Sequence, residues 1–317
     1  MASGQYAGDA GVNPLHWAAR AGPWVLVAGL VVGLGSPTAA AAMRPWIPHL
    51  VVVLLFLAAL RLEPTALATA RQGWGRAVST VLVLQCALPL GVLAIGWLAG
   101  LIGSDGLLAL VVMLSASAIS SSPNMCLMLG RPPEPAIRLL ILGTVLLPIT
   151  VVPVFLALPR LGGVGPVLTA AAILAATILA ATAAAQGIRR FVWRDISASQ
   201  RASLDGLSAI MLAIFVVGLM QAAADVLAAA PLRMLGWLGL ALAANFGLQL
   251  CTWAVVGRHW PPDQAIATSL AAGNRNMALF LVSLPADVLE PILIFIGCYQ
   301  IPMYITPLVM RRLWSAS

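Results

Sequence analysis

The stretch "SLAAGNRNMALFLV", residues 269–282, decides how this chain folds. Its apolar character is interrupted by Gly273, Asn274, Arg275 and Asn276, and then resumes. If these four residues formed a loop between two membrane spans, each flanking segment would be too short, because a helix needs about 20 residues to cross a bilayer. The polar break therefore lies within one crossing, where irregular backbone is tolerated only inside protein or beside a water-filled cavity.

The composition indicates an all-α polytopic membrane protein. The chain has 317 residues, of which 61% are hydrophobic and 9% charged, and its mean hydropathy is +1.00, whereas soluble domains carry roughly 25% charged residues. Its net charge of +7 comes from arginines in short segments between apolar runs, a pattern of cytoplasmic loops rather than of a nucleic-acid-binding surface. The lipid bilayer is therefore an expected partner, and nucleic acid is not.

Ten predicted transmembrane helices cover residues 17–36, 45–62, 77–101, 107–130, 135–158, 165–187, 204–228, 232–256, 263–284 and 289–310.

The arginines also predict the orientation. With a cytoplasmic N-terminus, thirteen of them fall in cytoplasmic segments, against Arg44, Arg160 and Arg233 outside, and Arg275 belongs to neither set. This bias predicts an integral protein of a bacterial inner membrane with both termini cytoplasmic. Small residues after the first apolar segment resemble a signal-peptide cleavage site, but no strongly basic segment precedes it. We therefore expect this segment to be retained as a helix.

The ten predicted helices divide into two groups of five. The fifth and the tenth each carry two prolines at the same spacing, Pro148 and Pro153 in one and Pro302 and Pro307 in the other. Asn124 lies 24 residues before the first pair, and Asn276 lies 26 residues before the second. An odd number of helices per copy makes the second copy insert upside down, as in many secondary transporters. We therefore predict two inverted five-helix repeats, residues 1–158 and 159–317, in one membrane unit.

A second polar break is predicted in the fourth helix, within "SASAISSSPNMCLML", residues 115–129. Ser122 before Pro123 predicts an N-cap at which a half-helix restarts. Polar breaks at corresponding points of two halves indicate a transporter's substrate site, and half-helix N-termini favour an anion. The candidate substrate-binding residues are Arg275, Asn276, Asn124, Asn274, Ser121 and Ser120. Two alternatives stay open: the serines could fill small-residue helix contacts, and Arg275 could brace a backbone carbonyl at the crossing.

The order and spacing of five motifs give the chain a family resemblance over essentially its whole length. The motifs are "VVVLLFLAALRLEP" (51–64), "LQCALPLGV" (84–92), "SPNMCLMLGR" (122–131), "PITVVPVF" (148–155) and "AAGNRNMAL" (271–279). On these residues the chain resembles a divergent member of the bile acid:sodium symporter family, whose wider relatives include arsenite and auxin-type carriers. The resemblance implies a panel of helices 1, 2, 6 and 7 and a core of helices 3–5 and 8–10, with broken helices 4 and 9 crossing. It also implies alternating access for small organic anions such as bile acids, pantoate or keto acids, usually driven by sodium.

The chain departs from that family at its sodium sites. Gln85 and Asn124 match family ligands and are the possible residual sodium ligands. Ala271 and Arg275 stand where the family usually has a glutamate and a glutamine. A fixed guanidinium repels a nearby sodium ion. We therefore expect no cofactor and little dependence on sodium.

Three classes of function remain to be compared. The leading hypothesis is a secondary transporter of a small organic anion. An anion-binding membrane receptor or sensor that does not transport is the main alternative, since coupling residues are missing. A membrane-embedded enzyme would need a nucleophile–base pair, a carboxylate pair or a metal cluster. Because no such group accompanies the serines and asparagines of the breaks, we do not expect an enzyme.

Overall fold

The computed structural model describes residues 13–61, 73–193 and 196–314, and every regular element within these ranges is helical. Arg71 and Arg194, two of the arginines assigned to cytoplasmic segments, lie outside the described residues. The α-helices are α1 (Pro14–Arg20), α2 (Gly22–Gly35), α3 (Pro37–Met43), α4 (Ile47–Arg61), α6 (Trp74–Leu82), α7 (Leu88–Leu98), α8 (Asp105–Ser115), α9 (Ser122–Met128), α10 (Glu134–Leu156), α11 (Val164–Phe191), α12 (Ala198–Ala229), α13 (Pro231–Val256), α14 (Pro262–Gly273), α15 (Phe280–Ser283), α16 (Ala286–Leu289) and α17 (Leu293–Trp314). Short turns join several of them: the 3₁₀ turns η1 (Arg44–Trp46), η3 (Pro159–Leu161), η4 (Met277–Leu279) and η5 (Glu290–Ile292), and the π-helical turn η2 (Val83–Ala87).

Seven helical segments of the described chain are long and apolar enough to cross a membrane, which marks this as an integral membrane protein. They are Pro37–Arg61, Trp74–Leu98, Glu134–Leu156, Val164–Phe191, Ala198–Ala229, Pro231–Val256 and Ala286–Trp314. Each falls on one of the ten predicted spans. The other three predicted spans are not continuous helices.

The first predicted span, 17–36, is bent rather than straight. Helices α1 and α2 meet at an angle of 90°. The fourth predicted span, 107–130, is split into α8, of 11 residues, and α9, of 7 residues. The ninth, 263–284, is split into α14, of 12 residues, and the short segments η4 and α15. The last two interruptions coincide with the polar breaks expected from the sequence.

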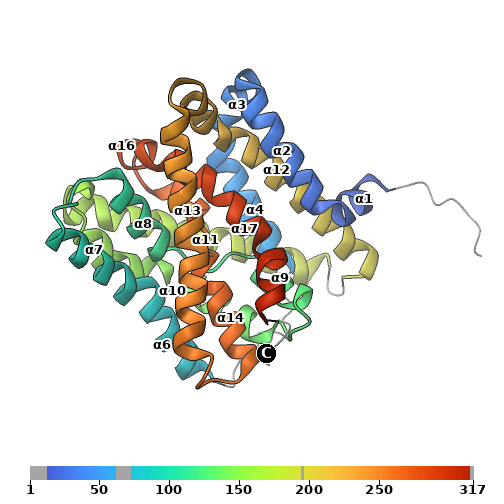
Figure 1. The fold of residues 1–317 in the computed structure, drawn as a ribbon. Coiled ribbons are helices and arrows are strands. Elements are labelled where there is room, and N and C mark those ends of the chain that lie inside the picture. The colour runs from blue at the N-terminus through green and yellow to red at the C-terminus, as the bar shows by residue number, and fades with distance from the viewer. Residues whose placement is uncertain (1–12, 62–72, 194–195, 315–317) are drawn as a thin grey trace, which may run out of the picture.

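The helix contacts can be followed as two groups that are in extensive contact with each other. In one group, α12 packs against α1, α2, α3 and α4, and α4 packs against α11. In the other, α13 packs against α14 and α17, while α10 packs against α6, α9 and α14. Contacts of α10 with α11 and of α12 with α17 join the groups. In Figure 1, α13 runs down the front of the molecule, with α6 to α8 on one side and α1, α2 and α12 on the other.

Local sequence explains several helix starts. At the start of α12, Ser197 and Gln200 form a capping box, in which each side chain accepts a hydrogen bond from the other residue's backbone N–H. Ser104 accepts from the backbone N–H of Leu107 at the start of α8. Inside the molecule, Phe155 of α10 packs against Phe280 of α15 with ring centres 5.4 Å apart. This contact fixes the short helix after the second break against a full-length span.

Candidate functional site

The two polar breaks meet and pair through their backbones. The chain leaves α8 in an extended conformation at Ala116 and leaves α14 in an extended conformation at Asn274. The backbone N–H of Ile119 donates to the carbonyl of Asn274 over 3.0 Å, and the N–H of Asn276 donates to the carbonyl of Ser117 over 2.8 Å. The breaks therefore form an isolated antiparallel bridge. Each break satisfies polar backbone groups of the other, as irregular backbone within a membrane requires.

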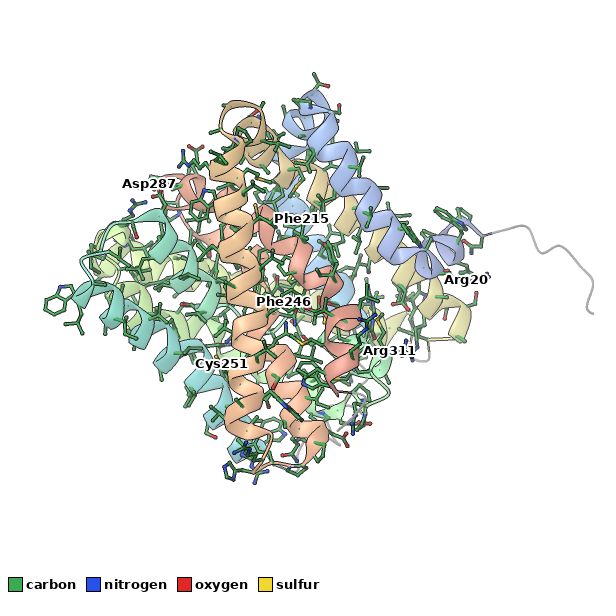
Figure 2. The ribbon with its side chains drawn as sticks, in the orientation of Figure 1. Arg20, Phe215, Phe246, Cys251, Asp287 and Arg311 are labelled. Carbon is green, nitrogen blue, oxygen red and sulfur yellow. The ribbon has the colours of Figure 1, made fainter. Side chains whose placement is uncertain are left out.

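Arg275 lies at the centre of this crossing and is almost completely enclosed. The charged side chains of Arg20, Asp287 and Arg311 are exposed at the periphery (Figure 2), whereas Arg275 is 2% exposed. Its guanidinium donates to three backbone carbonyls: from Nε to Ala272 at 2.9 Å, from Nη1 to Ala116 at 2.9 Å and from Nη2 to Leu84 at 3.1 Å. Three different membrane segments are thus joined by one side chain.

The Leu84 carbonyl is available to Arg275 because of the π-helical turn η2. In an α-helix this carbonyl would accept from the N–H of Leu88. Here the N–H of Leu88 donates to Val83 instead. The next residue along is Pro89, which has no N–H to donate. The quoted motif "LQCALPLGV" therefore creates a free carbonyl, and π-turns of this kind are common at functional sites.

The other two carbonyls lie at helix C-termini. Ala116 is the C-cap of α8, and Ala272 is in the last turn of α14. A helix C-terminus carries about half a negative charge. At an effective dielectric of about 20, a unit charge about 4 Å from such an end gains on the order of 2 kcal/mol. The guanidinium therefore offsets two converging negative ends that lipid could not solvate.

Little space remains beside this guanidinium. A void of about 10 Å³ is bordered by Arg275, Gln85 and Ala271, among others. That volume is close to the minimum for one water molecule, and an organic anion does not fit. The contacts correspond to the bracing alternative considered from the sequence. Direct contact between Arg275 and a substrate stays a prediction.

Asn274 faces a different set of partners, in a buried polar cluster on α13 and α17. Its Oδ1 accepts from Asn245 and from Thr306, each over 3.2 Å, and its own amide donates to Leu270 over 3.0 Å. Gln249 donates to Asn245 over 2.7 Å. These side chains, together with Tyr299, whose hydroxyl donates to the Gly273 carbonyl, hold the end of α14 in place. The predicted ligand Asn274 is thus committed to the protein interior.

Sequence reasoning missed Asn245, Gln249 and Thr306. A signal was present, because Asn245 and Gln249 are four residues apart in an otherwise apolar span and so share one helix face. Both are fully buried. A polar pair of that kind in a membrane helix predicts an inward face with partners on a neighbouring helix.

The possible sodium ligands do not come together. The Gln85 amide donates to the Gly143 carbonyl over 3.1 Å, and its Oε1 accepts from Thr150 over 3.0 Å. Asn124 is exposed on α9 and makes no side-chain hydrogen bond with the described residues. No hydrogen bond in the described part of the chain joins Gln85 to Asn124. A residual sodium site built from both stays a prediction.

The remaining candidates are less buried than Arg275 and Asn274. Ser120 and Asn124 are exposed, and Ser121 and Asn276 are half-buried. Their side chains make no hydrogen bond with other described residues. The predicted N-cap at Ser122 is wrong: α9 already includes Ser122, and the residue before it, Ser121, makes no capping bond. The hydroxyl of Ser122 is instead buried without a partner among the described residues.

Other chemistry is sparse. No group of three His, Cys, Asp or Glu side chains in the described ranges could hold a metal ion. Of the cysteines, Cys126 and Cys298 are buried, Cys86 is half-buried, and Cys251 is exposed on α13 (Figure 2). The exposed Cys251 on a long apolar span fits a lipid-facing position.

Comparison with known proteins adds no relative. No protein-family model matches the chain, and no curated protein is similar enough to be counted as related. The function must therefore be argued from the chain itself.

Proposed function

We propose that this protein is a secondary transporter of a small organic anion that works by alternating access. The observation that carries the proposal is the pairing of two interrupted membrane segments through Ala118 and Arg275. Interrupted helices at mid-depth are costly and occur where a membrane protein binds and releases a solute. Ser120, Ser121, Asn124 and Asn276 offer uncommitted polar side chains beside this pairing. We assign the substrate contacts to them.

The described ion pairs support ten crossings with alternating direction. Arg44 pairs with Glu290 over 3.2 Å, and Arg160 pairs with Asp105 over 2.8 Å. Each pair joins two segments that the sequence assigns to the outer side. Arg61 pairs with Asp205 over 3.2 Å and Arg131 with Asp263 over 3.4 Å, and all four belong to segments assigned to the cytoplasm. With the excess of cytoplasmic arginines, this supports both termini inside a bacterial inner membrane.

An inverted duplication is supported by matching polar pairs in the two halves. In the first half, Thr150 lies between the two prolines of α10 and donates to Gln85. In the second half, Thr306 lies between the two prolines of α17 and accepts from Gln249 over 3.3 Å. Each pair thus connects the third and the fifth helix of its half. The pairs support residues 1–158 and 159–317 as two copies of one unit, with the panel and core as its parts.

Arg275 supports a carrier that does not require sodium. Its guanidinium already supplies a cation to the converging ends of α8 and α14. A mobile ion at the same place would lie within a few ångströms of a fixed positive charge, which costs several kcal/mol at an effective dielectric of about 20.

Counterflow in proteoliposomes tests the proposal. Vesicles loaded with unlabelled taurocholate or pyruvate are diluted into the labelled compound, with sodium or with choline as the cation. We expect protein-dependent uptake of at least one probe class, at similar rates in both cations. We expect Asn124→Ala to reduce it, while Thr182→Ala, an exposed control on α11, leaves it unchanged.

The same measurements identify the main alternative. Stabilisation of the protein by an anion without counterflow in any vesicle would replace the transporter by a receptor. Uptake that disappears in choline would refute the sodium-independent part alone. If Asn124→Ala and the control show equal uptake, the proposal that Asn124 contacts the substrate is refuted.

A further inference from the structure

A second polar site lies away from the crossing, where α6, α10 and α14 begin. A half-open cavity of about 230 Å³ lies there and is lined by residues of all three helices, including Arg76, Arg138, Thr80 and Gln264. Drug-sized ligands occupy cavities of about 300–1,000 Å³. The space therefore suits a small charged group rather than a whole organic solute.

The depth of the cavity in the membrane follows from the helices that form it. Helices α6 and α10 open two of the long apolar spans, and the cavity residues lie in or beside their first two turns. Trp74 is 40% exposed at the same level, and Trp260 lies next to Arg76. Tryptophan is enriched at the membrane–water interface. We therefore expect the cavity near the membrane–water interface, where lipid phosphates lie.

The donors in the cavity are cationic and held in place. Arg76 donates from Nη1 to Gln264 over 2.8 Å and lies 5.4 Å from the ring centre of Trp260. This hydrogen bond uses one of its five N–H groups. Gly73 makes room for Arg138: a Cβ there would be 3.2 Å from Nη1 of Arg138, and the positive φ of 82° also favours glycine.

We propose that this cavity binds a phosphate oxyanion, supplied by the headgroup of an anionic lipid, between Arg76 and Arg138. Basic pockets between membrane helices are suited to such headgroups. Arginine is suited to phosphate because its planar donors bind two oxygens at once. The cavity differs from the small void beside Arg275, although Leu139 borders both. Its proposed ligand does not depend on the proposed transport activity.

Lipid titration of the purified full-length protein tests this site. Native mass spectrometry and thermal melting are recorded with dioleoylphosphatidylglycerol, with dioleoylphosphatidylcholine and with inorganic phosphate. We expect phosphatidylglycerol to bind more tightly than phosphatidylcholine. At about fivefold in affinity for each arginine, the double variant Arg76→Gln with Arg138→Gln should bind it on the order of 30-fold more weakly. Arg233→Gln, an exposed arginine at the start of α13, is the matched control.

Unchanged phosphatidylglycerol affinity in the double variant would overturn the site. An equal loss in Arg233→Gln would overturn it too, because the attraction would then belong to the whole surface. If inorganic phosphate stabilises the protein as much as the lipid does, the phosphate site stands and its lipid source is refuted. The single variant Arg76→Gln, at an exposed side chain, keeps the test valid if the double variant does not fold.

Discussion

Replacing Arg275 by glutamine should destabilise the protein without any change at its surface. The substitution removes a donor of three hydrogen bonds, to Ala272, Ala116 and Leu84. A glutamine can reach one of these carbonyls and leaves two buried and unsatisfied, at about 1–3 kcal/mol each. Removing a buried charge recovers part of its desolvation cost. We expect a net loss of about 3 kcal/mol, which corresponds to a fall of roughly 6–10 °C in melting temperature for a large domain.

Thermal melting of purified variants in one detergent measures this effect. Arg275→Lys keeps the charge but lacks the planar fork, so its melting temperature should lie between those of the wild type and Arg275→Gln. Arg233→Gln, at an exposed arginine, should melt like the wild type. A glutamine variant that melts within 1–2 °C of the wild type, a loss of at most about 1 kcal/mol, would refute the bracing role. Substrate binding would then be the remaining role for Arg275.

Three further substitutions test the surroundings of the crossing by the same melting assay. Gly273→Ala would place a Cβ 2.3 Å from the Asn245 carbonyl oxygen and should cost about 1–3 kcal/mol; wild-type stability would mean that α13 and α14 are not in close contact. Thr306→Val removes the hydroxyl of the buried cluster and should cost about 1–3 kcal/mol, whereas Thr306→Ser should keep most of it; equal losses would assign the effect to packing. Asp105→Asn breaks the ion pair with Arg160; the side chains of Asp105 and Arg160 are 33% and 34% exposed. The free energy of unfolding should fall by less than about 1 kcal/mol, and a larger loss would show that further charges take part in the pair.

The positions of the breaks could be predicted from the sequence, because length and polarity act locally. Gly273 to Asn276 cannot lie in a continuous apolar helix, and their flanks cannot cross a membrane separately. The partners of Arg275 could not be predicted in the same way. They depend on three segments far apart in the chain, and the Leu84 carbonyl is free only because a π-turn precedes Pro89. A sequence shows that a donor is present, but packing decides which acceptor it meets.

The half-helices show why the expected electrostatics changed. Anion binding was predicted at half-helix N-termini, but α9 has 7 residues and α15 has 4. The segments before the breaks, α8 and α14, are the longer ones, with 11 and 12 residues. The larger dipoles therefore present negative C-termini to the crossing.

Two negative ends that meet within a membrane need a cation, which can be mobile or tethered. A mobile ion supplies the charge only while it is bound, so the geometry of the crossing then depends on ion concentration. Arg275 supplies the charge permanently, because its guanidinium stays protonated in proteins. The crossing can then keep its shape whether or not a solute ion is present. Because no ion needs to bind at the crossing, an ion gradient cannot be coupled to the substrate at this point. For the proposed transporter, a tethered charge at the crossing predicts that the substrate moves down its own gradient or in exchange for another anion.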